Sequence, residues 1–184
     1  MADLSWSSSK SDWEKFVGYL DPRPGDTILD IGAGKGTVSR RVMAMADGVK
    51  VTAVDPDPKR IATLTKDLPG VSAHVSGAES LPFPDRSFNK AYSTFAAHHF
   101  IDFGKALLEA RRVLVPGGSM VIVDVNPLST RGRVIRFFEN TLQRSRMNFM
   151  ERDQMVSIMV EKGLLVKESS LGKTSYMVLA LRRD

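Results

Sequence analysis

The stretch Thr27-Ile-Leu-Asp-Ile-Gly-Ala-Gly-Lys-Gly-Thr-Val-Ser-Arg40 decides the fold of this chain. An apolar run typical of a buried strand leads into Gly32, Gly34 and Gly36, and the residues that follow place valines at helical spacing. A glycine turn between a strand and a helix presents bare backbone N–H groups and the positive end of a helix dipole to a ligand. The stretch therefore predicts a ligand site at the end of a buried strand.

The spacing of the glycines separates this turn from two other phosphate-binding turns. Dinucleotide-binding folds use Gly-x-Gly-x-x-Gly, and the third glycine of that pattern would fall on Thr37. A P-loop needs Gly-Lys followed by Ser or Thr, whereas Lys35 is followed by Gly36. Neither a dinucleotide site nor a P-loop is therefore expected.

Four motifs in order, from about residue 27 to 125, resemble those of the class I S-adenosylmethionine-dependent methyltransferases. They are Asp30 with the glycine turn, Asp55 at the end of the next strand, Gly77–Phe83 followed by Pro84–Phe88, and Arg112–Gly118. The motif sequences are most similar to those of the small-molecule subgroup, methyltransferase type 11, which includes the ubiquinone and menaquinone biosynthesis enzymes. Four motifs in the family's order are far more specific than any one of them.

This resemblance implies an α/β fold, a Rossmann-like three-layer sandwich with a seven-stranded, mostly parallel sheet and an antiparallel last strand. It implies S-adenosylmethionine as cofactor, with Asp55 accepting both ribose hydroxyls. At the matching positions, the predicted cofactor-binding residues are Asp30, Gly32, Ala33, Gly34, Gly36, Asp55, Pro56, Gly77, Ala78 and Glu79. Because the sulfonium donor is already activated, the protein's contribution is mainly alignment and exclusion of water.

Two positions depart from the family's pattern. Gly77 stands where relatives usually carry an aspartate that holds the adenine amino group, so the backbone of Ala78, or Glu79, is left to recognise the base. Asn89 replaces the usual aspartate after Phe88. The first change removes a hydrogen bond worth about 1–3 kcal/mol.

The pattern along the chain alternates strands and helices, which is typical of a parallel sheet covered on both faces. A capping box at Ser11–Glu14 predicts a helix within residues 1–25, an N-terminal helix or cap. A helical stripe from Phe103 to Leu114 precedes a turn at Pro116–Gly118, and residues 164–182 read as an antiparallel hairpin. We expect residues 1–184 to form a single domain.

Residues 126–150 form an insert that a minimal fold of this kind does not need. It has apolar residues at helical spacing, and six arginines lie between positions 131 and 152: Arg131, Arg133, Arg136, Arg144, Arg146 and Arg152. One interpretation is a lid over the methyl-acceptor pocket whose arginines favour an anionic acceptor. The other is an amphipathic helix packed on the sheet with a solvated basic face.

His98 and His99 follow the fourth predicted strand, on the side where a general base for the acceptor would lie. Two adjacent side chains cannot both point inward, and a base is needed only if the acceptor loses a proton. Asp124 and Asn126 are similar to ligands of metal-dependent catechol methyltransferases, but no third ligand is evident and no metal is predicted. His74, inside a strand, is expected to be structural.

The composition narrows the function without identifying it. The chain has no cysteine, which excludes disulfides, thiolate metal sites and cysteine catalysis. It shows no leader sequence and no apolar run of about 18 residues, so a cytoplasmic protein without a membrane span is expected. The leading hypothesis is methyl transfer to a small molecule. A sequence pI of about 9.6 and the arginines of the insert keep RNA open as a less favoured substrate. The altered adenine motif keeps open a non-catalytic S-adenosylmethionine-binding protein.

Overall fold

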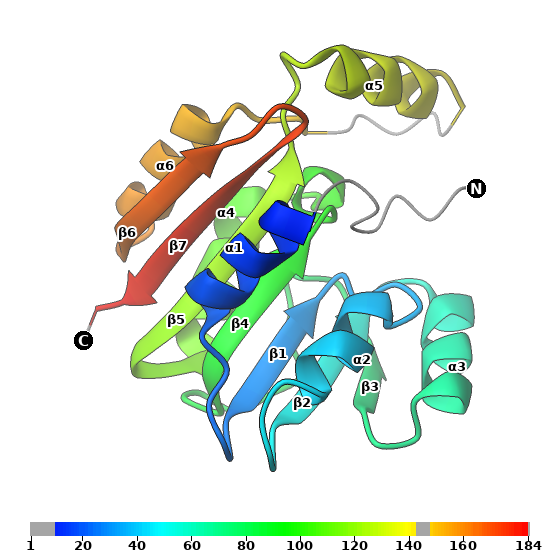
Figure 1. Cartoon of the computed structure of the whole chain (residues 1–184), viewed down its shortest axis with the longest axis vertical. Coiled ribbons are helices and arrows are strands. Elements are labelled where there is room, and N and C mark those ends of the chain that lie inside the picture. Colours follow the sequence, from blue (N-terminus) through cyan, green and yellow to red (C-terminus); the bar gives the residue numbers. More distant parts are fainter. Residues whose placement is uncertain (1–9, 143–147, 184) are drawn as a thin grey trace.

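The computed structural model describes residues 10–142 and 148–183, and its strands form one sheet in the order β3-β2-β1-β4-β5-β7-β6 (Figure 1). The strands are β1 (Thr27–Ile31), β2 (Lys50–Asp55), β3 (Ser72–Val75), β4 (Phe88–Thr94), β5 (Leu114–Val125), β6 (Leu164–Leu171) and β7 (Ser175–Arg182). The helices are α1 (Lys10–Leu20), α2 (Thr37–Met43), α3 (Pro58–Asp67), α4 (Phe103–Val113), α5 (Thr130–Leu142) and α6 (Arg152–Glu161), with a short 3-10 turn, η1 (Ala97–His99).

The predicted sheet is confirmed, including its reversed last strand. The pairs β3–β2, β2–β1, β1–β4 and β4–β5 are parallel, whereas β7 is antiparallel to both of its neighbours, β5 and β6. A short turn joins β6 to β7, where the Gly172 N–H donates to the Ser175 carbonyl at 2.8 Å. So short a connection permits only an antiparallel neighbour, while the parallel pairs need helical crossovers.

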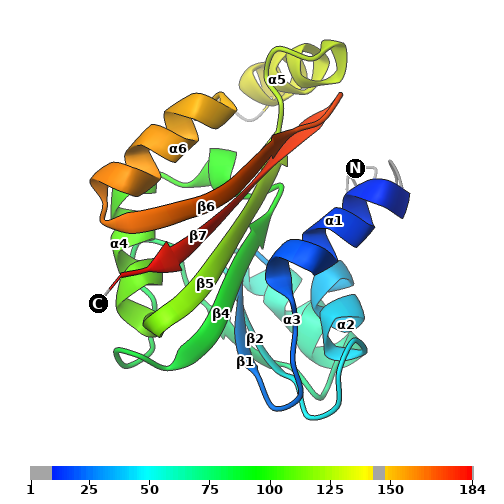
Figure 2. The same ribbon diagram turned by 60° about the vertical axis from the view of Figure 1, so that its left-hand side comes forward.

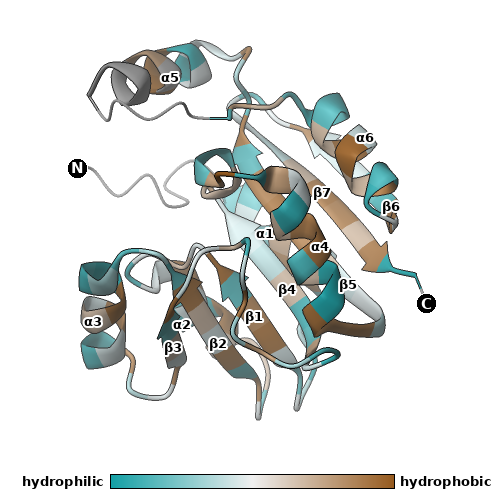
Figure 3. Ribbon diagram, turned by 180° about the vertical axis from the view of Figure 1, so that it is seen from behind, coloured by the Kyte–Doolittle hydropathy of each residue, from teal (hydrophilic) through white to brown (hydrophobic). Residues whose placement is uncertain are grey.

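Helices cover both faces of the sheet, which makes three layers (Figure 2). On β1, Ile28 faces a cluster with α1, α2 and α3, whereas Leu29 and Ile31 face a cluster with α4 and α6. This alternation follows from the two-residue period of a strand. Figure 3 shows the apolar residues gathered along the strands that these helices cover. Of the described helices, none has the length and apolar character needed to cross a membrane.

The junction between α4 and β5 differs from the prediction. Leu114, expected at the end of the helical stripe, is the first residue of β5, and Pro116–Gly118 lies within that strand. Leu114 pairs with Phe88, but the next pair joins Ser119 to Lys90, so β5 bulges between them. The predicted turn is therefore a bulge within β5, because β4 pairs with Leu114 before the bulge and with Ser119 after it.

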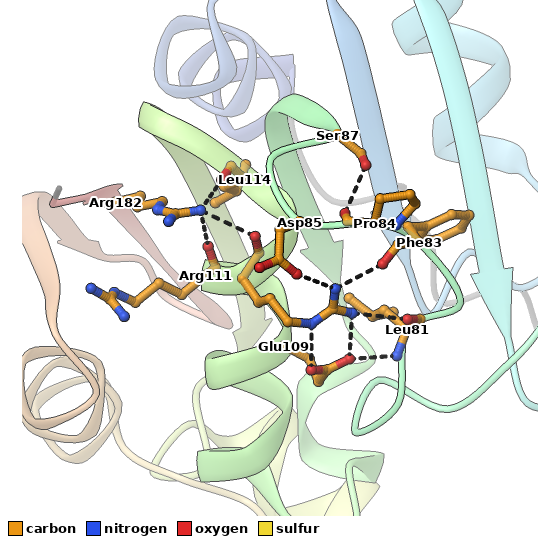
Figure 4. Close-up of polar contacts among 10 residues, drawn as sticks. Leu81, Phe83, Pro84, Asp85, Ser87, Glu109, Arg111, Leu114 and Arg182 are labelled. Carbon is orange, nitrogen blue, oxygen red and sulfur yellow. Dashed lines mark hydrogen bonds and ion pairs between the residues drawn. The ribbon is translucent and has the colours of Figure 1, made fainter.

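Arg112, on α4, holds the loop that follows β3 against this helix. Figure 4 labels its partners Leu81, Phe83, Asp85 and Glu109. Its guanidinium donates to the carbonyls of Leu81 and Phe83 at 3.0 and 2.7 Å. It also donates to the carboxylates of Asp85 at 2.9 Å and Glu109 at 2.8 Å. The hydrogen bond from Arg112 lowers the pKa of Glu109, and Glu109 in turn accepts the Leu81 N–H at 2.9 Å. Arg112, the first residue of the motif Arg112–Gly118, therefore anchors the loop between β3 and β4.

Replacing Arg112 by leucine is expected to lower the free energy of unfolding by about 2–4 kcal/mol, because two carbonyls and two carboxylates lose a charged donor. Arg152→Leu is the matched control. The two side chains are similarly exposed, 30% and 31%, but among the described residues the Arg152 side chain makes its hydrogen bond and its ion pair with the neighbouring Asp153. The control should change stability by less than about 1 kcal/mol. Urea unfolding followed by circular dichroism measures both, and equal losses would contradict the anchoring role.

Candidate cofactor and acceptor site

The predicted site residues converge at one edge of the sheet, where β1, β2 and β4 end (Figure 1). The glycine loop from Gly32 to Gly36 follows β1, Asp55 is the last residue of β2, and His98 lies in the turn after β4. In open parallel sheets, ligands bind outside the carboxyl ends of the strands. The topology therefore brings the separate sequence motifs to the same edge.

The glycines of the loop are required for different reasons. Gly32 has a φ of +80°, and an added Cβ would lie 2.4 Å from the Ala96 Cβ. Gly36 caps α2, and an added Cβ there would meet the Leu68 side chain at 2.8 Å. Gly34 also has a positive φ, +58°, but nothing lies within 4 Å of its added Cβ. Packing thus explains Gly32 and Gly36, while Gly34 borders open space.

The loop amides are not bare, which corrects the prediction from sequence. The N–H groups of Gly32 and Ala33 donate to the Val54 carbonyl at 2.8 and 3.0 Å. The Gly34 N–H donates to the Asp55 carboxylate at 2.9 Å. These three donors therefore hold the loop to β2. A ligand would meet the opposite side of the loop, where Gly34 leaves room.

Asp55 is both a buried structural acceptor and a candidate ligand. It is 2% exposed, and its second carboxylate oxygen accepts the Asp57 N–H at 2.9 Å. Arg60 lies 3.8 Å away and adds positive charge. Each carboxylate oxygen can accept two hydrogen bonds, so capacity remains for hydroxyl donors. Pro56, the next residue, is exposed at this edge.

Asp30 lies behind the glycine loop and is 1% exposed. One carboxyl oxygen accepts the Ser39 hydroxyl at 2.5 Å and the Tyr92 hydroxyl at 2.8 Å. The other oxygen has no hydrogen-bond partner among the described residues. Burial raises the pKa of Asp30 to about 7. Asp30 supports the loop from within, and only its second oxygen is left for a cofactor.

Glu79 anchors the segment Gly77–Phe83, which the resemblance places beside the adenine. Its carboxylate accepts the N–H groups of Ile101 at 2.7 Å and Asp102 at 3.2 Å, which ties the segment to the start of α4. Ala78 is buried, with 5% of its surface exposed. A Cβ at Gly77 would lie 3.0 Å from the other Glu79 oxygen.

The histidine pair divides as expected, with one side chain inside and one outside. His98 is 4% exposed and His99 is exposed. The His98 Nδ1 lies 2.6 Å from the Asp124 carboxylate, which also accepts the His98 backbone N–H at 2.9 Å. The His98 ring stacks on Phe149 of the insert with centroids 4.7 Å apart. The pairing of His98 with Asp124 was not predicted, because His98 follows β4 and Asp124 lies near the end of β5.

The other polar candidates have structural partners. Asn126 accepts the Leu128 N–H at 3.1 Å, so it shapes the turn after β5. Over the described residues, no group of histidine, aspartate and glutamate side chains could hold a metal ion. His74 is partly buried in β3, 3.1 Å from the Ser72 hydroxyl. The Phe83 ring meets it edge-on.

The insert contributes α5, which stands beyond this same edge and lies along neither face of the sheet (Figures 1 and 2). The interpretation of a helix packed on the sheet is therefore wrong for α5. Arg133 is exposed and Arg131 partly exposed. Arg144 and Arg146, which belong to the predicted basic cluster, lie outside the described residues.

Comparison with known proteins identifies the family. A profile described as "Methyltransferase domain" matches residues 29–122. The demethylmenaquinone methyltransferase of Thermotoga maritima is 30% identical over 177 residues, which cover 84% of this chain and 77% of that enzyme. The chain belongs to the S-adenosylmethionine-dependent methyltransferases. It is accordingly an enzyme of this class, with S-adenosylmethionine as its cofactor.

Other relatives agree with this assignment. The 2-methyl-6-phytyl-1,4-hydroquinone methyltransferase of Synechocystis is 33% identical over 138 residues, 73% of this chain and 43% of that protein. The chain spans about half the length of two Chlorobaculum demethylmenaquinone methyltransferases, 49% and 56%. A methyltransferase structure from Mesorhizobium loti has a TM-score of 0.81 at 17% identity, covering 94% of this chain and 98% of that one. At that identity the likeness establishes the fold alone.

Alanine substitutions at two glycines of the methyltransferase should separate packing from ligand contact. Gly32→Ala is expected to lower the free energy of unfolding by about 2–4 kcal/mol, since it combines a clash with a left-handed backbone. Gly34→Ala should cost only about 1 kcal/mol, from its positive φ, yet weaken S-adenosylmethionine binding by about tenfold (about 1.4 kcal/mol). Urea unfolding and calorimetric titration provide the two measurements. Unchanged cofactor affinity in Gly34→Ala would show that no ligand lies in front of this residue.

Asp30 should make stability fall as the pH rises. Burial raises its pKa to about 7 from the ordinary value of 3.8, so the folded state binds more protons than the unfolded state between these values. The free energy of unfolding then declines by up to about 1.4 kcal/mol per pH unit in this window and levels off above 7. Asp30→Asn keeps an acceptor for Ser39 and Tyr92 and should remove this slope. Parallel pH profiles of the two proteins would contradict the assignment.

Proposed function

We propose that the chain transfers a methyl group from S-adenosylmethionine to the ring of a quinone-type or hydroquinone-type small molecule. The observation that carries this is the match to the Thermotoga demethylmenaquinone methyltransferase, which extends over 84% of the chain. The match to the Synechocystis hydroquinone enzyme supports the same acceptor class. Both printed names describe aromatic ring acceptors rather than nucleic acid.

The cofactor would lie across the glycine loop. In this proposal, the space in front of Gly34 receives the amino-acid part, and Asp55 accepts the ribose hydroxyls beside Pro56. The backbone of Ala78 meets the adenine, with Glu79 holding that segment in place. Bound S-adenosylmethionine supplies an activated methyl group, and the protein's residues position it and exclude water. The open space at Gly34 and the remaining acceptor capacity of Asp55 support this arrangement.

His98 is the proposed base for an acceptor that carries a ring hydroxyl. In this proposal, Nδ1 carries the ring proton and donates it to the Asp124 carboxylate, so that Nε2 is the basic ring nitrogen. Nε2 would take the hydroxyl proton, which would make the ring carbon electron-rich enough to receive the activated methyl group that bound S-adenosylmethionine would supply. The ring carbon would then lose its own hydrogen as a proton, and the ring oxygen would regain one. His99 is exposed and therefore less suited to this role. The insert, residues 126–150, is proposed to act as the lid, since its Phe149 stacks on His98.

The test is methyl transfer from isotopically labelled S-adenosylmethionine to a panel of hydroquinones, with products identified by mass spectrometry. Asp55→Ala should weaken cofactor binding by about tenfold to a hundredfold, since charge-assisted hydrogen bonds are lost. It should also lower stability, because Gly34 and Asp57 lose their acceptor. Asp57→Ala is the control, because that side chain is 45% exposed and caps α3.

His98→Ala should lower kcat and leave cofactor affinity unchanged, and Asp124→Asn should alter the pH dependence of kcat. Label that enters RNA but no hydroquinone would contradict the proposed acceptor. Equal cofactor affinity in Asp55→Ala and the parent enzyme would contradict the proposed ribose contact.

A further inference from the structure

Exposed apolar side chains gather at the end of the molecule beyond the carboxyl ends of the strands. Leu128 is 63% exposed before α5, Val134 and Phe137 are 49% and 68% exposed on α5, and Leu171 is 58% exposed at the tip of the β6–β7 hairpin. The Asn126 N–H donates to the Thr174 carbonyl at 2.9 Å, which joins the base of α5 to this hairpin. Figures 1 and 2 both show the two elements side by side.

The orientation of α5 is set by its first turn. An added Cβ at Gly132 would lie 2.0 Å from the Asn126 carbonyl oxygen, so the helix approaches the end of β5 more closely than a side chain would allow. Gly132 is buried, while Arg133, Val134 and Phe137 are exposed. At 3.6 residues per turn, these three residues fall within a sector of roughly 100°. One face of α5 is therefore turned to the body, and the opposite face presents both apolar and basic side chains.

The charge of this surface is positive. Arg133 is exposed and Arg131 is partly exposed on α5, and Lys173 is exposed in the hairpin turn. A second copy of the chain would bring like charges together. Nucleic acid would satisfy the arginines but would leave the aliphatic side chains in water. An amphipathic helix with arginines beside exposed apolar residues is typical of an element that lies in the interface of an anionic bilayer.

We propose that the outer face of α5 and the tip of the β6–β7 hairpin dock on an anionic phospholipid bilayer. Leu128, Val134, Phe137 and Leu171 enter the boundary between headgroups and acyl chains, and Arg131, Arg133 and Lys173 meet the lipid phosphates. Docking holds the edge of the sheet that carries the glycine loop and His98 toward the membrane. Delivery of a lipid-soluble acceptor from the bilayer to that edge rests on the proposed function, whereas docking itself does not.

Co-sedimentation with vesicles tests the proposal. The full chain should sediment with vesicles of phosphatidylglycerol and phosphatidylcholine and remain in solution with vesicles of phosphatidylcholine alone. The double variant Val134→Asp, Phe137→Asp should partition at least about tenfold more weakly. The control Leu108→Asp, Val160→Asp introduces the same charge at exposed apolar sites on α4 and α6, 47% and 57% exposed, and should sediment much as the parent does.

Two further measurements separate the outcomes. Arg131→Gln with Arg133→Gln should lose about tenfold or more in partition at low salt, with little further loss at high salt. All variants should keep the melting-temperature shift produced by S-adenosylmethionine, so a loss of docking is distinguishable from a failure of the proposed function. Equal partition on both vesicle types, or equal losses in the two aspartate pairs, would overturn the proposal. Light scattering that shows self-association through this face without vesicle binding would also overturn it.

Discussion

The hydrogen bond between the Asp55 carboxylate and the Gly34 N–H is the constraint on which the site depends. It joins the glycine loop after β1 to the end of β2, and the Val54 carbonyl adds two bonds to the same loop. Because the loop is held from the β2 side, its other side stays open in front of Gly34. The same carboxylate accepts the Asp57 N–H and so positions the start of α3. One acidic residue thus shapes the loop, the helix start and the candidate cofactor surface together.

Buried polar pairs connect this surface to the layers of the fold. Asp30 on β1 accepts hydroxyl groups from Ser39 on α2 and Tyr92 on β4, so it links three elements below the loop. Near the end of β5, Asp124 fixes both the backbone and the ring of His98, which follows β4. Such pairs must be satisfied when buried, since an unpaired polar group costs more than a hydrogen bond contributes. They therefore hold the strand ends in one relative position.

Much of the fold could be predicted because its signals are local. The glycine turn, the alternation of strands and helices and the closing hairpin all follow from patterns that lie within a few residues. Two of the predictions that were wrong concern pairing between distant segments. The loop amides were expected to be bare, but the Val54 carbonyl and Asp55 use them. Leu114 continued a helical stripe in sequence, yet its pairing with Phe88 makes it the start of β5.

The sequence by itself determined which residues are candidates for chemistry: the glycine loop, Asp55 and a histidine pair of which one member turns inward. The tertiary structure alone decided their partners. Asp30 meets Tyr92 across 62 positions, and His98 meets Asp124 across 26. Parallel strands bring these residues together through a register that only the packed sheet sets. Local patterns therefore name the residues, but the geometry of the site depends on long-range pairing that no short stretch of sequence contains.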